Sequence, residues 1–125
     1  MATRLACVAD EDLHRRLRAG VTVNGLTDLH DILEYWGDAF RSDGQSDGTV
    51  TEEEMRALLD FDAFLEERFW SRPGFPDTEE WSWLFAREAP LPQSWRETVT
   101  LARATLHRFT DFDLQRWREA GCRVW

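Results

Sequence analysis

The sequence contains no lysine, so all fifteen of its basic residues are arginines. We attribute this bias to the coding genome, although arginine also suits protein interfaces. No apolar run approaches the ~20 residues that a membrane-spanning helix needs. The apolar stretch 5–9 is also too short for the core of a signal peptide. These absences predict a cytoplasmic protein that does not bind a membrane.

Cysteine is scarce as well. Cys7 and Cys122 are the two in the chain, and they lie near opposite ends without a CxxC partner. In a cytoplasmic protein the expected state is two reduced, partly buried thiols. A disulfide bridge that ties the two ends of the chain together is the alternative.

The familiar catalytic motifs are also missing. The sequence has no GxSxG, P-loop or dinucleotide-binding fingerprint, and its three histidines form no HExxH pattern. His30 and Glu34 lie one helical turn apart, a spacing that more often gives a surface contact than half of a metal site. We therefore expect the protein not to be an enzyme.

The composition is that of a folded domain with an aromatic core. Hydrophobic residues make up 42% of the chain and include seven Trp and eight Phe. Many of them recur at the helical spacings of three and four. We therefore predict an all-α fold, a single compact domain over residues 1–125 with five to six short helices. The turn-rich stretch 71–76 divides it into an acidic part, 1–70, and a tryptophan-rich part, 77–125.

Three helices are expected in the acidic part. Asp10 is suited to cap the first, which carries Leu13 and Leu17 and ends at Gly20. The second follows Thr27 as its cap, and its apolar stripe comprises Leu29, Ile32, Leu33, Trp36 and Phe40. The third begins after Thr51, and its apolar positions are Met55, Leu58, Leu59, Phe61, Phe64, Leu65 and Phe69.

Three more helices are expected in the tryptophan-rich part. Thr78 is suited to cap the first, which carries Trp81, Leu84 and Phe85. Ser94 and Glu97 have the spacing of a capping box for the second. The apolar face of that helix comprises Trp95, Val99, Ala102, Leu106 and Phe109. The last helix is short, starts at Thr110 or Asp111, and carries Leu114 and Trp117 before Gly121.

The stretch 43–54, DGQSDGTVTEEE, lies between the second and third expected helices. It places side-chain oxygens at its first, third, fifth, ninth and twelfth positions, with Gly48 at the sixth and Val50 at the eighth. A glycine at the sixth position permits a sharp turn. Alternating side-chain and backbone oxygens around such a turn can supply the six to eight ligands that Ca²⁺ prefers. The short extended piece 21–25 is suited to pair with the backbone near Val50.

This stretch resembles an EF-hand calcium loop, and with its flanking helices the resemblance covers about residues 29–65. The resemblance implies a bound Ca²⁺ whose ligands are Asp43, Gln45, Asp47, Thr49 through its carbonyl, Thr51 directly or through water, and bidentate Glu54. Gln45 departs from the family pattern, which favours Asp, Asn or Ser there. Ordinary turn residues, with Thr51 and Glu54 as a capping box, are the alternative interpretation of the same stretch.

The charge of the chain is unevenly distributed. Residues 28–67 carry thirteen acidic residues and two arginines, a net charge of −11, whereas the rest of the chain carries +2. Such a field disfavours nucleic acid as a direct ligand and suits a cation or a basic protein surface. Within it, the polar side of the third helix and the residues after it present Asp60, Asp62, Glu66 and Glu67.

Two functions from different classes are therefore expected. The first is a non-enzymatic calcium-binding protein, in which a single hand is structural, regulatory or paired in a homodimer. The second is a small acidic inhibitor, of the immunity or anti-CRISPR type, that binds a basic nucleic-acid-handling partner and imitates nucleic acid. Most of the tryptophans are expected to pack in the core. Trp83 and Trp125 are the expected exposed aromatic anchors for a partner.

Overall fold

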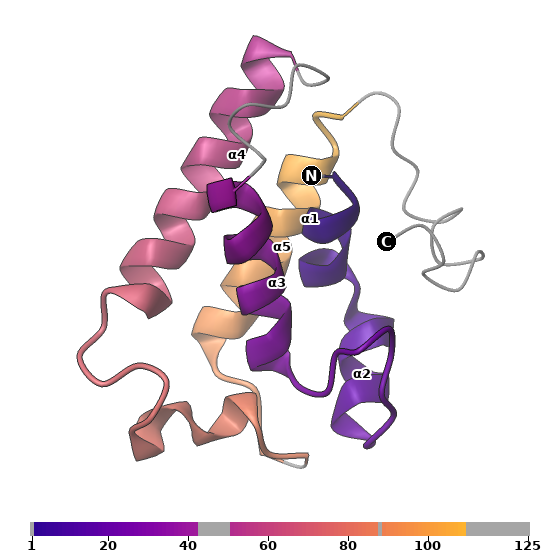
Figure 1. Cartoon of the computed structure of the whole chain (residues 1–125), viewed down its shortest axis with the longest axis vertical. Helices are drawn as coiled ribbons and strands as arrows, with labels where there is room; N and C mark the ends of the chain where they lie inside the picture. Colours follow the sequence, from indigo (N-terminus) through magenta and orange to yellow (C-terminus); the bar gives the residue numbers. More distant parts are fainter. Residues whose placement is uncertain (1, 43–50, 88, 110–125) are drawn as a thin grey trace.

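The computed structural model describes residues 2–42, 51–87 and 89–109. Five α-helices run through these ranges (Figure 1): α1 (Ala2–Ala9), α2 (Glu11–Arg18), α3 (Leu29–Ser42), α4 (Glu52–Leu65) and α5 (Gln93–Leu106). A π-helical turn, η2 (Glu66–Trp70), extends α4, and a short 3₁₀-helix, η3 (Glu79–Leu84), precedes α5. Within the described ranges there is no β-strand, so the predicted all-α domain is confirmed.

Helix α1 is the element that the sequence prediction missed. All five residues from Leu5 to Ala9 are fully buried, and the helix packs against α5 and against α3. In Figure 1 it lies beside α5 near the centre of the molecule. The prediction placed the first helix after Asp10. Asp10 does cap a helix, but that helix is α2, the second in the chain.

The predicted features of α2 are confirmed. The side chain of Asp10 accepts a hydrogen bond from the backbone N–H of Asp12 at 3.1 Å, Leu13 and Leu17 are buried, and Gly20 follows the last turn with a φ of +91°. A left-handed residue is the usual way to end a helix.

The stretch after α2 folds back on itself. Val23 and Leu26 exchange two backbone hydrogen bonds, of 3.1 and 2.9 Å. Asn24 and Gly25 between them both have positive φ, as a tight two-residue reversal requires. The extended backbone of Val23 thus has a local partner. The other partner expected for it, near Val50, lies outside the described residues.

Helix α3 buries the predicted stripe, with Leu29, Ile32, Leu33, Trp36 and Phe40 all 0–2% exposed. Its cap differs from the prediction. Asp28, not Thr27, accepts the N–H of Asp31, at 2.8 Å. Thr27 instead donates its N–H and its hydroxyl to the Asp31 carboxylate. The helix begins one residue later than a Thr27 cap requires.

Helix α4 and η2 bury Leu58, Phe61, Leu65 and Phe69, as predicted. Leu59 was expected on the same stripe but is 45% exposed. Because successive residues of a helix lie about 100° apart, a face centred on Leu58 and Leu65 turns Leu59 outward. The indole N–H of Trp36 donates to Asp62 at 3.0 Å and joins α3 to α4.

Trp83 was predicted to be exposed and is not. It is 8% exposed, and its ring lies 5.7 Å from that of Trp95 and 6.3 Å from that of Phe69. The prediction assumed an α-helix, in which Trp83 leaves the apolar stripe. The segment is a six-residue 3₁₀-helix, whose three residues per turn place Trp81 and Leu84 on one face. Trp83 points about 120° away from that face and is buried because the rings of Phe69 and Trp95 cover it. Phe85, expected on the stripe, is 48% exposed.

Helix α5 has the predicted buried face of Trp95, Val99, Ala102, Leu106 and Phe109. The predicted capping box at its start is wrong. Pro92 occupies the cap position without a side-chain hydrogen bond. The carbonyl of Ser94 accepts the Thr98 hydroxyl, and Glu97 pairs with Arg68 at 3.1 Å. Glu97 therefore joins α5 to η2 instead of closing a cap.

Two further observations complete the fold. None of the helices in the described part of the chain combines the length and apolarity that crossing a bilayer requires. Cys7 is buried in α1. Its possible partner Cys122, the terminal Trp125 and the expected helix from Thr110 to Gly121 all lie outside the described residues.

His14 is a buried titratable group between α1 and α5. It is 3% exposed, its Nε2–H donates to the carbonyl of Cys7 at 2.8 Å, and its ring packs edge-on against Trp95. A carbonyl oxygen can only accept, so the proton lies on Nε2. Burial lowers the pKa of His14 to about 4, and the ring is neutral at pH 7.

This pKa predicts a stability that depends on pH. Between about pH 6.5 and about pH 4 the unfolded chain binds a proton at His14 that the folded chain does not. The free energy of unfolding should therefore fall by roughly 2 kcal/mol between about pH 6.5 and about pH 5. Urea denaturation at both values should show this loss, and His14→Gln should remove most of it. The exposed His107, changed to Gln, is the matched control. An unchanged pH dependence in His14→Gln would contradict the assignment.

Candidate metal centre and acidic face

The two helices that flank the predicted calcium loop have their near ends at the positions that the loop pattern requires. Helix α3 ends at Ser42, directly before the first predicted ligand, and α4 begins at Glu52, directly after the ninth loop position. The predicted ligands Asp43, Gln45, Asp47 and Thr49 lie outside the described residues. Of the six, Thr51 and Glu54 are described.

Thr51 and Glu54 form the capping box that the sequence predicted. The Glu54 N–H donates to the Thr51 hydroxyl at 3.1 Å, and the Thr51 N–H donates to a Glu54 carboxylate oxygen at 2.8 Å. The carboxylates of Glu52, Glu53 and Glu54 all lie in the first turn of α4, where the positive end of the helix dipole stabilises them. The helix start is thus organised by side chains of the loop itself.

The ring of Trp36 holds the two flanking helices together. It stacks on Phe40 with ring centres 5.3 Å apart and meets Phe61 of α4 edge-on at 5.1 Å. Its hydrogen bond to Asp62 makes that carboxylate a structural group, half-buried between α3 and α4. The other three acids proposed for partner binding, Asp60, Glu66 and Glu67, are exposed.

A second group of possible metal ligands was not predicted from the sequence. Ligand atoms of Asp28, His30 and Asp31 lie within 4.8 Å of one another, the one such group among the described residues. Oxygens of both aspartates already accept hydrogen bonds at the start of α3, and burial raises the pKa of Asp28. These carboxylates act first as a helix cap. In the sequence, the pattern D-x-H-D at residues 28–31 is only a weak signal of a metal site.

His30 belongs to an aromatic cluster as well. Its side chain is 13% exposed and lies 3.5 Å from the Glu34 carboxylate, so the predicted contact with Glu34 is present. Rings of Trp70, Phe75 and Phe85 surround it at 5.4–6.2 Å. The histidine is therefore mainly a packing residue that joins α3 to the segment after η2.

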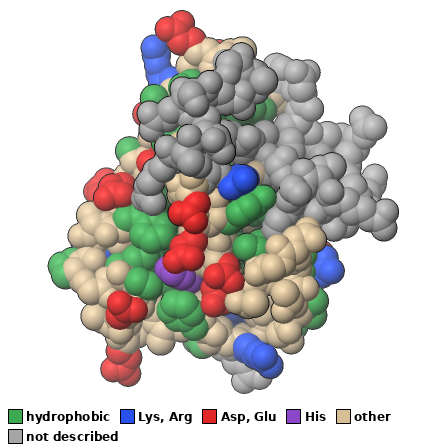
Figure 2. All heavy atoms as spheres, in the orientation of Figure 1, with side chains coloured by type: hydrophobic (Ala, Val, Ile, Leu, Met, Phe, Trp, Pro, Cys, Tyr) green, Lys and Arg blue, Asp and Glu red, His purple; other side chains and the backbone are tan. Residues whose placement is uncertain are grey.

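An acidic ridge runs along the surface of α3. It consists of Asp31, Glu34 and Asp38, which recur at spacings of three and four and so share one side of the helix. Figure 2 shows acidic side chains gathered over α3, with hydrophobic side chains and a histidine beside them. The sequence predicted a negative field over residues 28–67, and this ridge is the part of it that the fold aligns in one row.

Comparison with known proteins gives no relative. No protein-family model matches the chain, and neither a curated protein nor a solved structure is significantly similar to it.

The capping box predicts a stability effect that needs no metal. Thr51→Ala removes the acceptor for the Glu54 N–H and should lower the free energy of unfolding by about 1 kcal/mol. Urea denaturation in the presence of a chelator measures it. Thr78→Ala is the matched control, because Thr78 also precedes a helix but its side chain makes no capping bond there. Equal losses in the two variants would show that the Thr51 hydroxyl does not stabilise α4.

Proposed function

We propose that the protein is a non-enzymatic calcium-binding protein with one EF-hand-like site. Its ligands are Asp43, Gln45, Asp47, the Thr49 carbonyl, Thr51 and Glu54. The observation that supports the proposal is the position of the two helix ends. Helix α3 stops at Ser42 and α4 starts at Glu52, so the first nine of the twelve loop positions lie between the helices and the last three form the first turn of α4.

The packing of the flanking helices also supports the proposal. An ion held by ligands from one loop needs the two loop ends kept at a fixed separation. The Trp36–Asp62 hydrogen bond and the contact of Trp36 with Phe61 provide such a link between α3 and α4. Glu54 contributes from a helix start that is already capped, so its side chain needs no folding of α4 in order to reach the ion.

The site works as a single hand in this proposal. A paired hand would need a second loop that supplies calcium ligands. The loop between α2 and α3, residues 19–28, contains the tight reversal at Val23–Leu26 and a single acidic residue, Asp28. Calcium then acts by stabilising the α3–α4 pair or by joining two copies of the chain. Which of these holds depends on whether the helices move when the ion binds.

Calorimetric titration with Ca²⁺ tests the proposal. The parent protein should release or absorb heat with one site per chain, and Glu54→Gln should weaken binding by at least about tenfold. Glutamine still serves in a capping box, so this change removes the second carboxylate oxygen and the charge without uncapping α4.

Glu53→Gln is the matched control. It removes the same charge from the neighbouring residue of the same turn, and Glu53 is not among the proposed ligands. This change should weaken Ca²⁺ binding only slightly, because it lowers the overall negative charge near the site without removing a ligand. Absence of heat at millimolar Ca²⁺, or equal affinities of the two variants, would remove the calcium proposal.

The acidic ridge favours a second candidate function. Three carboxylates in a row on α3, in a chain of net charge −9, suit an inhibitor that docks on a basic surface of a nucleic-acid-handling protein. Exposed Leu59 and Asp60 on α4 offer a further surface that mixes one apolar side chain with acids. This candidate is compatible with calcium binding, because the ridge and the loop use different residues.

A pull-down at low and high salt tests the second candidate. A stoichiometric partner should be recovered at low salt, lost at high salt and unaffected by a chelator. The double change Glu34→Arg and Asp38→Arg should abolish recovery, whereas the same charge reversal at the exposed Glu79 and Glu80 should not. Loss of the complex on adding chelator would favour the calcium function instead, and equal recovery by both double variants would remove the ridge from the interface.

A further inference from the structure

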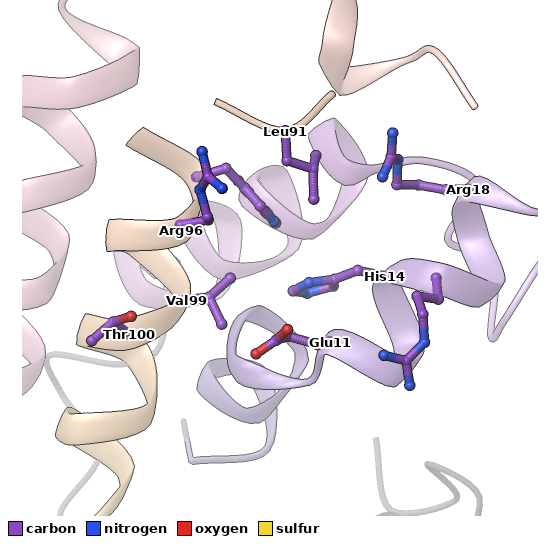
Figure 3. Close-up of a pocket in the computed structure, with 9 residues that line it drawn as sticks. Glu11, His14, Arg18, Leu91, Arg96, Val99 and Thr100 are labelled. Atoms are coloured by element: carbon purple, nitrogen blue, oxygen red, sulfur yellow. The ribbon is translucent and has the colours of Figure 1, made fainter. Parts of the chain in front are cut away.

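A cavity of about 370 Å³ lies between α2 and α5 and shares no lining residue with the acidic ridge. Its walls combine apolar and basic side chains. In Figure 3, Arg18 of α2 and Arg96 of α5 flank Leu91, and the ring of His14 points into the space between the helices, opposite Val99. A volume of this size is within the range of small-molecule sites.

The charge of this cavity is opposite to that of the chain as a whole. Arg15, Arg18 and Arg96 line it against one acid, Glu11. Glu11 is paired with Arg103 at 2.8 Å, and Arg15 is paired with Asp12 at 2.8 Å. Arg18 and Arg96 form no ion pair with any residue that the structure describes. The walls therefore carry a net positive charge in a chain of net charge −9.

Two buried N–H groups at the cavity lack an acceptor. Trp95 lines the cavity and is 1% exposed, yet its indole Nε1 has no hydrogen-bond partner among the described residues. The same holds for Nε of Arg18, although another guanidinium nitrogen of that side chain donates to the carbonyl of Ala89. A buried donor without an acceptor is destabilising. Neither nitrogen is accessible to solvent, so a ligand oxygen would reach it only after a shift of the side chain.

We propose that this arginine cavity (Arg15, Arg18 and Arg96, with Trp95) binds a small aromatic carboxylate. The two oxygens of the carboxylate accept from the arginines. The aromatic ring of the ligand lies against Leu91, Val99 and the ring of His14.

The walls suit a carboxylate. The guanidinium group matches a carboxylate in geometry. Arg18 is half-buried, so its contact with a ligand is screened less by solvent than a contact of the exposed Arg15 or Arg96. Glu11 lines the same cavity, and its hydrogen bond to Arg103 holds the pKa of that carboxyl below its usual value. Glu11 is thus ionised near neutral pH, and its pairing with Arg103 leaves the three arginines to set the charge of the walls.

Nuclear magnetic resonance titration with benzoate tests the proposal on the full chain. Benzoate should shift the indole N–H resonance of Trp95, which is identified by its loss in Trp95→Phe. Benzamide has the same shape without the charge and should bind at least about tenfold more weakly. Arg96 is exposed on α5, so Arg96→Gln should fold normally and weaken benzoate binding by a similar factor.

Arg72→Gln is the matched control, because Arg72 is also exposed and does not line the cavity. It should leave the benzoate affinity unchanged. The proposal is overturned if benzoate gives no shift up to about ten millimolar, a concentration at which even a weak fragment registers. It is also overturned if benzamide binds as tightly as benzoate, or if Arg96→Gln binds benzoate as the parent does.

Discussion

The enclosure of α1 is the constraint on which the rest of the described structure depends. Five successive buried residues, Leu5 to Ala9, leave this helix no solvated face, so the last carbonyls of the helix need partners from the protein. Its neighbours supply them. His14 donates to the Cys7 carbonyl at 2.8 Å, and Arg103 of α5 donates to the Ala9 carbonyl at 3.4 Å. The burial of a neutral imidazole therefore serves to satisfy the end of α1, and both α2 and α5 are held against that end.

The helices that could be predicted from the sequence are those with one buried face and one solvent-exposed face. Helices α2, α3, α4 and α5 each bury one stripe, and a stripe leaves a period in the sequence. Residues 5–9 of α1 are all buried, so this part of the helix has no polar face to mark it, and a short apolar run is ambiguous by itself. Trp83 was misplaced for a related reason. In a six-residue 3₁₀-helix the neighbouring rings of Phe69 and Trp95, which are distant in sequence, decide which way the side chain turns.

The sequence could predict the candidate calcium site only from the spacing of its side-chain oxygens, because the spacing of Thr51 and Glu54 has two interpretations. Thr51 and Glu54 have the spacing both of a capping box and of the ninth and twelfth loop ligands. In the capped state a Glu54 oxygen accepts the Thr51 N–H, and a bidentate contact to calcium has to compete with that bond. In the proposed site this competition would lower the affinity for calcium. The capped start of α4 would offset part of this loss, since no helical turn has to form when the ion binds.

Folding brings together arginines that are far apart in the sequence, and the composition of the chain does not reveal this. Outside residues 28–67 the chain carries +2, a value that predicts no basic site, and residues 18 and 96 are too far apart in sequence to suggest one. The Asp10 cap starts α2 directly after α1, and α5 packs along α1. Both helices therefore present their arginines beside the same end of α1. The acidic ridge lies on α3 and the cavity between α2 and α5, so one small chain keeps a negative ridge and a positive cavity on different helices.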